Sequence, residues 1–157
     1  MKITTIPFAN SCVSQVFEGK TVVVIDVLRA TSTMITALMH GAAEIIPVVE
    51  IEEALERKND FPPSQVLLCG ERSAGIIPGF DLGNSPFDYT SERVTGKTLI
   101  MSTTNGTKAI NLASKAKELV LASFINALAV AKYLNKVDDL VLFCSGTHGN
   151  FSLDDAL

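Results

Sequence analysis

The chain has 157 residues, of which 47% are apolar and 19% charged, and its formal net charge is −4. This length suits one domain with a substantial core. The acidic balance, without a basic stripe, argues against nucleic acid as a partner, and no apolar run reaches the ~20 residues of a membrane-spanning helix. Three scattered cysteines and the lack of a signal peptide favour a cytoplasmic protein.

Apolar runs alternate with segments of helical period along the whole chain. In chain order, we expect strand 2–8, strand 21–27, helix 31–41, strand 44–49, helix 51–58, strand 66–69, strand 98–102, helix 104–116, strand 119–122, helix 126–134, strand 140–144 and a last helix after Ser152. This alternation predicts an α/β fold of three layers, with helices on both faces of one largely parallel or mixed sheet.

Two segments depart from this pattern. Residues 70–96 show little periodicity and are rich in Gly, Pro, Asn, Asp and Ser, and a loop of that length is usually functional or mobile. The chain stops at Leu157, shortly after its last helix begins. We therefore expect a single domain, residues 1–157, that is incomplete at its C-terminus and whose last helix continues.

Polar residues follow four of the predicted strands. These segments contain Asp26 and Arg29, Glu71 and Arg72, Thr103 to Gly106, and Ser145 with Gly146 followed by Asp154 and Asp155. In open α/β sheets, ligands bind beyond the carboxyl ends of the strands, so we expect these groups to share one site.

The residue types in these segments point to phosphoryl chemistry. Helix N-termini made of small residues offer free N–H groups to phosphate or sulfonate, and arginines add bidentate donors. Acids can hold a hard cation such as Mg²⁺. The candidates for anion binding are Thr103, Thr104, Asn105, Gly106, Ser145 and Gly146, and those for metal binding are Asp26, Glu71, Asp154 and Asp155.

Each feature also has a purely structural interpretation. Asp26 could cap the following helix, and Ser152 with Asp155 resembles a capping box. Asn105-Gly106 could be only a tight turn, and the two arginines could pair with the neighbouring acids. The coincidence of four polar strand ends favours a shared site over four separate structural roles.

Several familiar motifs are absent. Gly96-Lys97-Thr98 precedes a strand and lacks the earlier glycine of a P-loop. Cys144 lacks an arginine six residues later, as a cysteine phosphatase requires, and is interpreted as a buried thiol. His148 is either a general acid or a solvent-facing loop residue.

Taken together, the stretches 24–31, 70–72, 79–86, 103–107 and 146–155 resemble the 2-phosphosulfolactate phosphatases, a family linked to coenzyme M biosynthesis. The resemblance implies an α/β fold distinct from better-known phosphatases, Mg²⁺ dependence, and hydrolysis of 2-phospho-3-sulfolactate to 3-sulfolactate and phosphate. It also implies that family members extend beyond the equivalent of Leu157.

Under this interpretation, Asp26, Arg29, Glu71 and Arg72 are the catalytic candidates and the substrate is a small polyanionic phosphoester. Either water or a carboxylate such as Asp26 attacks phosphorus. The alternatives are a phosphatase for another small anionic phosphoester and a non-catalytic module that binds small anions. A homo-oligomer is compatible with the sequence.

Overall fold

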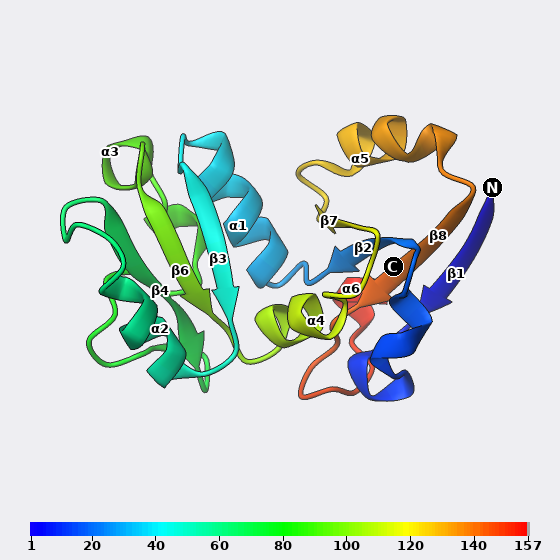
Figure 1. The fold of residues 1–157 in the computed structure, drawn as a ribbon, viewed down its shortest axis with the longest axis horizontal. Coiled ribbons are helices and arrows are strands. Elements are labelled where there is room, and N and C mark those ends of the chain that lie inside the picture. The colour runs from blue at the N-terminus through cyan, green and yellow to red at the C-terminus, as the bar shows by residue number, and fades with distance from the viewer. Residues whose placement is uncertain (157) are drawn as a thin grey trace.

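The computed structural model describes residues 1–156, so Leu157, the last residue of the predicted domain, lies outside the described part. The α/β class predicted from the sequence is confirmed. The strands nevertheless divide between two four-stranded sheets, where the sequence pattern predicts one sheet. Figure 1 shows the two sheets on opposite sides of the molecule, with α1 (Ala30–Met39) and α4 (Gly106–Leu112) between them.

The first sheet is parallel throughout and has the strand order β1-β8-β2-β7. These strands are β1 (Lys2–Ile6), β2 (Thr21–Ile25), β7 (Glu118–Ala122) and β8 (Asp139–Cys144). The β-branched run of β2 is buried on both faces, as expected of a central strand. Val22 and Val24 pack in the main core with Phe17, whereas Val23 packs on the other face against Leu134.

The second sheet is mixed and has the order β3-β6-β4-β5. It contains β3 (Glu44–Val48), β4 (Val66–Arg72), β5 (Gly75–Ile76) and β6 (Thr98–Ser102), and α2 (Ile51–Lys58) packs against β4 and β6. Only the pair β4–β5 is antiparallel. Leu99 and Met101 of β6 belong to the same core cluster as Val22 of β2, so the two sheets share one core.

The division into two sheets follows from the two helices between them. Helix α1 leads from β2 in the first sheet to β3 in the second, and α4 leads from β6 back to β7. Periodicity identifies each segment as helix or strand, but it does not specify which strands pair.

Several predicted boundaries shift in the structure. Strands 2–8 and 21–27 end at Ile6 and Ile25, helix 104–116 begins at Gly106, and β4 continues to Arg72. The loop 70–96 contains β5 and the short helices η3 (Pro86–Asp88) and α3 (Ser91–Val94). The remaining helices are η1 (Ala9–Ser11), η2 (Ser14–Phe17), α5 (Ala127–Tyr133), η4 (Leu134–Lys136) and α6 (Leu153–Ala156).

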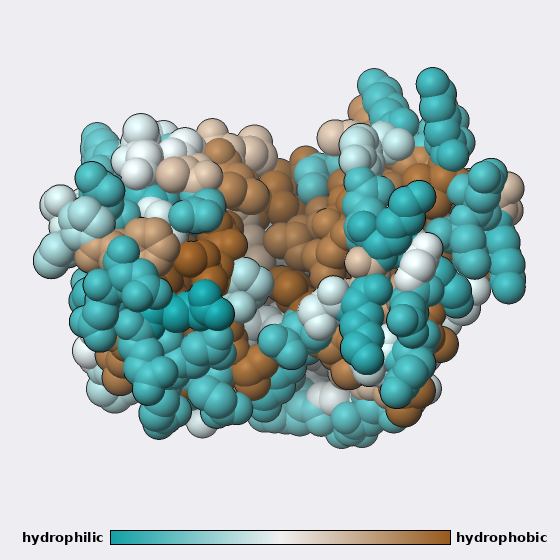
Figure 2. Space-filling view, viewed as in Figure 1, coloured by the Kyte–Doolittle hydropathy of each residue, from teal (hydrophilic) through white to brown (hydrophobic). Residues whose placement is uncertain are grey.

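Figure 2 shows apolar residues, coloured brown, gathered in the hollow between α1 and α5. Exposed apolar residues of these helices and of the loop before α5 are Leu38, Met39, Phe124, Ile125 and Leu128. Among residues 1–156, no helix has the length and apolar character needed to cross a bilayer.

Candidate functional site

A cavity of about 260 Å³ lies where the segments after β2, β4, β6 and β8 meet. We call it the carboxylate pocket. Its lining residues are Asp26, Leu28, Arg29, Glu71, Ser73, Ala74, Asn84, Thr103, Thr104, Asn105, Thr147 and His148. The structure therefore brings together Asp26, Arg29, Glu71 and the turn that leads into α4, as the sequence predicts.

Asp26 lies on the turn between β2 and α1 and is only 5% exposed. Its Oδ1 accepts a hydrogen bond from the Ala30 N–H at 3.0 Å, so it caps α1, as the structural interpretation holds. Burial, with a smaller contribution from the nearby Asp155 charge, raises the pKa of Asp26 to about 6, against the lowering effect of the Ala30 N–H. Asp26 thus combines a capping role with a place in the pocket.

Glu71 reaches the same pocket from the end of β4 in the second sheet. Its Oε1 accepts a hydrogen bond from the Thr104 N–H at 2.7 Å, and its Oε2 accepts one from the Ala74 N–H at 3.2 Å. These two bonds fix the carboxylate between the β4–β5 hairpin and the turn before α4.

Neither carboxylate forms a salt bridge in the described part of the chain. Within the described residues 1–156, the salt bridge between Arg57 and Glu53 on the surface of α2 is the only one. Buried charges in proteins are normally paired or bound to metal, so Asp26 without an ion pair is unusual. Mg²⁺ is commonly bound by one or two carboxylates together with waters and substrate phosphates, and Asp26 with Glu71 provides that set of donors.

The backbone around the pocket is strained. Ser73, Ala74 and His148 have φ values of 51°, 61° and 50°, and they are the non-glycine residues with positive φ in the described chain. All three line the carboxylate pocket. A non-glycine residue in the left-handed region costs on the order of 1 kcal/mol, and such residues cluster at functional sites.

The two arginines differ in position. Arg29 is exposed and lines the pocket. The Arg72 guanidinium instead donates hydrogen bonds to the Val49 carbonyl at 2.6 Å, the Ser102 hydroxyl at 2.8 Å and the Glu71 carbonyl at 2.8 Å. Arg72 therefore joins the ends of neighbouring strands in the second sheet, and it is not part of the pocket lining.

Asp155 is held by three donors. Its Oδ1 accepts a hydrogen bond from the Val27 N–H at 2.8 Å, and its Oδ2 accepts bonds from the Ser145 hydroxyl and the Gly146 N–H, both at 3.0 Å. Burial raises its pKa. Ser145 and Gly146, predicted to bind substrate, are thus partners of Asp155, which joins the turn after β2 to the turn after β8.

Asp154 does not line the carboxylate pocket. Its carboxylate is hydrogen-bonded to the Ser152 hydroxyl, and it lines another cavity together with Asp155. Within residues 1–156, no group of three or more His, Cys, Asp or Glu side chains is arranged to hold a metal ion. The four predicted metal ligands therefore separate into Asp26 and Glu71, which share a pocket, and Asp154 and Asp155, which do not line it.

The remaining predicted residues surround the entrance of α4. Thr103 Oγ1 accepts a hydrogen bond from the Thr107 N–H at 3.0 Å and thereby stabilises the first turn of the helix. A Cβ on Gly106 would lie 2.4 Å from Ala30 Cβ and 2.8 Å from Asp26 Oδ2. Glycine at this position allows α4 to begin directly against Asp26.

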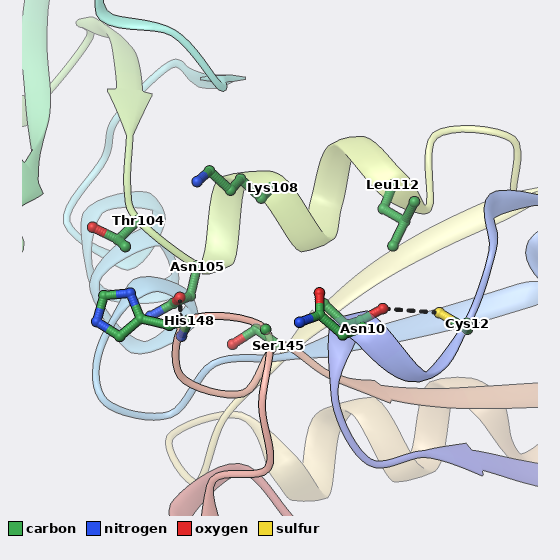
Figure 3. A pocket seen from close by; sticks show the side chains of 10 residues that line it. Asn10, Cys12, Thr104, Asn105, Lys108, Leu112, Ser145 and His148 are labelled. Carbon is green, nitrogen blue, oxygen red and sulfur yellow. Dashed lines mark hydrogen bonds between the residues drawn. The ribbon is translucent and has the colours of Figure 1, made fainter.

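A larger cavity of about 650 Å³ adjoins the carboxylate pocket, and the two share Thr104, Asn105 and His148. Figure 3 shows Lys108 extending from the first turn of α4 toward Thr104, with Asn10 on the opposite side of Ser145 from His148. The His148 N–H donates to Asn105 Oδ1 at 2.8 Å.

Sequence reasoning missed Asn84 and Lys108, which line the carboxylate pocket and the larger cavity respectively. Asn84 lies in the non-periodic loop, although within one of the stretches that resemble the phosphatase family. Lys108 is a cation in the first turn of a helix, where the helix dipole favours acids. This unfavourable placement is the feature of the sequence that could have marked Lys108 as a binding residue.

The comparisons with known proteins identify the family of the chain. The family model for 2-phosphosulpholactate phosphatase matches residues 9–157. A protein of Thermotoga maritima named probable 2-phosphosulfolactate phosphatase is 52% identical over 140 residues, which are 89% of this chain and 60% of that protein. Proteins with the same name from Caldanaerobacter subterraneus and Clostridium perfringens are 48% and 52% identical over 158 residues, covering 66% and 64% of their lengths.

The chain thus spans between 60% and 66% of the length of these relatives. The match with the family model extends over nearly all of its residues, and it includes every segment that lines the carboxylate pocket. The chain belongs to the 2-phosphosulpholactate phosphatase family.

Proposed function

We propose that this protein is a magnesium-dependent phosphatase that hydrolyses 2-phospho-3-sulfolactate to 3-sulfolactate and phosphate. The observation that supports it most is the pair of carboxylates, Asp26 and Glu71, in one pocket without a basic partner among residues 1–156. Family membership supports the substrate, because the relatives are named as probable phosphatases of this compound.

Asp26 and Glu71 would hold the metal. Bound Mg²⁺ supplies charge stabilisation at the phosphoryl oxygens and lowers the pKa of a bound water. The positive charge of Mg²⁺ would also stabilise the ionised form of Asp26, whose pKa is raised by burial and by the Asp155 charge. Both carboxylates are oriented in advance by backbone N–H groups, so little rearrangement is needed to receive a cation.

Arg29 would bind the phosphate from the open side of the pocket. Its guanidinium is exposed, lines the pocket and has no acidic partner among residues 1–156. Arginine forms bidentate hydrogen bonds with phosphoryl oxygens, and such donors stabilise the charge that develops there during transfer.

The adjoining larger cavity would bind the rest of the substrate. Sulfolactate has a carboxylate and a sulfonate in addition to the phosphoester oxygen, so a second cation near the carboxylate pocket is needed to balance these charges. Lys108 lines the larger cavity and extends toward the wall that both cavities share, which suits this role.

The test is release of phosphate from 2-phospho-3-sulfolactate and from 2-phospholactate, which lacks the sulfonate, with and without Mg²⁺. We expect Mg²⁺-dependent release and a preference for the sulfonate. Lys108→Met should raise KM for the sulfonated substrate by about 10-fold, the effect of losing one charge-assisted hydrogen bond, and should change KM for 2-phospholactate less.

Lys115→Met is the matched control, because Lys115 is exposed and lines neither cavity. Absence of phosphate release from either compound, with Mg²⁺ present and the protein folded, would contradict the proposed activity. Equal rates with both compounds would instead indicate a phosphatase for another small phosphoester.

A further inference from the structure

Two buried oxygen atoms that belong to the lining of the carboxylate pocket have no hydrogen-bond partner within the described residues. They are Asn84 Oδ1 and Thr104 Oγ1. Leaving a buried polar atom without a partner costs about 1–3 kcal/mol, so native structures contain few of them. Both residues line one cavity, and a group bound there would satisfy the two atoms.

Asn84 is held firmly although it lies in the long loop. It is 8% exposed, and its carbonyl accepts a hydrogen bond from the Thr33 hydroxyl of α1 at 3.3 Å. The preceding Gly83 carbonyl accepts one from the Tyr89 hydroxyl at 2.6 Å, and the Leu82 carbonyl accepts one from the Gly70 N–H at 3.0 Å. The loop is thus anchored at Asn84 and at the two residues before it.

The unpartnered atoms add to an excess of oxygen acceptors in this pocket. Asp26 and Glu71 contribute carboxylates, Asn84 contributes an amide oxygen, and Arg29 is the only fully charged donor in the lining. Hard divalent cations bind carboxylate and amide oxygens together. An anion, by contrast, would be repelled by this part of the lining.

We propose that Asn84 provides, through Oδ1, a third protein ligand for the divalent cation that Asp26 and Glu71 hold. This inference rests on the metal dependence in the proposed function, and it assigns a role to the loop 70–96. The buried hydroxyl of Thr104 would bind a water molecule of the same cation.

The experiment measures Mg²⁺ binding to the metal-free protein by titration calorimetry, without substrate. Asn84→Asp places a charge on the same oxygen and should tighten Mg²⁺ binding by about 3-fold or more. Asn84→Leu keeps the size and removes the oxygen, so it should weaken binding by about 10-fold. Asn84→Ser, which keeps a smaller oxygen, serves if the leucine variant does not fold.

Asn111→Asp is the matched control, because it adds the same charge at an exposed position of α4 outside the pocket, and it should leave Mg²⁺ binding unchanged. If the folded Asn84→Asp and Asn84→Leu variants both bind Mg²⁺ like the wild type, the proposal is wrong. If Asn84→Asp leaves Mg²⁺ binding unchanged and weakens binding of inorganic phosphate, the amide nitrogen faces the anion and the proposal is again wrong.

The outcomes distinguish a failure of the proposed metal ligand from a failure of the proposed phosphatase activity. A protein whose Mg²⁺ affinity follows the Asn84 substitutions, but that releases no phosphate, would support the metal ligand and contradict the phosphatase. A wild-type protein that releases phosphate but binds no Mg²⁺ would overturn the role of Asn84 and leave the hydrolytic activity in place.

Discussion

Replacement of Asp155 by alanine would separate a structural role from a metal-binding one. The carboxylate accepts hydrogen bonds from the Val27 N–H, the Gly146 N–H and the Ser145 hydroxyl. After the substitution, the Ser145 hydroxyl can still donate to the Gly146 carbonyl, which lies 3.3 Å away, whereas the two backbone N–H groups lose their partner.

The expected loss of stability follows from those two groups. Each buried N–H without a partner costs about 1–3 kcal/mol. Part of this cost is offset, because the substitution also removes a buried carboxylate that raises the pKa of Asp26. We expect a net loss of about 3 kcal/mol, which corresponds to a fall in melting temperature of roughly 6–12 °C for a domain of this size.

The assay is a thermal melt of the metal-free protein, with Mg²⁺ titration of each variant at a temperature where it is folded. Asp154→Ala is the internal control, because within residues 1–156 the Asp154 carboxylate accepts a hydrogen bond from the Ser152 hydroxyl only, and it should shift the melt little. If Asp155→Ala melted like the wild type but lost Mg²⁺ affinity, our structural reasoning would fail and Asp155 would be a metal ligand.

Three further predictions concern the same region. Burial raises the pKa of Asp26 from 3.8 to about 6. The stability that its protonation contributes is therefore present below about pH 4 and is lost as the pH rises through 6. Asp26→Asn should flatten this part of the plot of melting temperature against pH for the metal-free protein. Gly106→Ala should destabilise the fold by about 1–3 kcal/mol in denaturant melts, since its Cβ would lie 2.8 Å from Asp26 Oδ2, while the exposed Gly75→Ala should have little effect. Cys144→Ser should retain phosphate release, because burial raises the pKa of this thiol to about 11 and its Sγ already donates to the Asp155 carbonyl at 3.1 Å. Loss of activity at an unchanged melting temperature would indicate thiol chemistry.

Local pattern was sufficient for some elements and not for others. The run of β-branched residues in β2 specifies a buried strand, and Asp26 at its end identifies the position of the site. Arg72 looked equally functional in the sequence, because an arginine beside an acid suits anion binding. Its partners include the Val49 carbonyl and the Ser102 hydroxyl, which belong to two other segments, and no local pattern encodes such contacts.

Asn84 was harder to recognise in the sequence than the other polar residues of the pocket. Asn84 belongs to no periodic segment, and its significance depends on the burial of one oxygen atom. Asp155 is the opposite case, because an acid near other acids suggested a metal ligand, and that role stays a prediction. Its actual environment, three donors from the turns after β2 and β8, depends on the tertiary fold.

The position of the site between two sheets has a consequence for the proposed cation. Asp26 follows β2 of the first sheet, whereas Glu71 belongs to β4 of the second, and the helices α1 and α4 pass between them. A cation bound to both carboxylates would therefore join the two sheets directly. A ligand that binds only the folded state stabilises it by about 2.7 kcal/mol at 100 times its Kd. Metal binding and the packing of the two sheets against each other would therefore be thermodynamically linked.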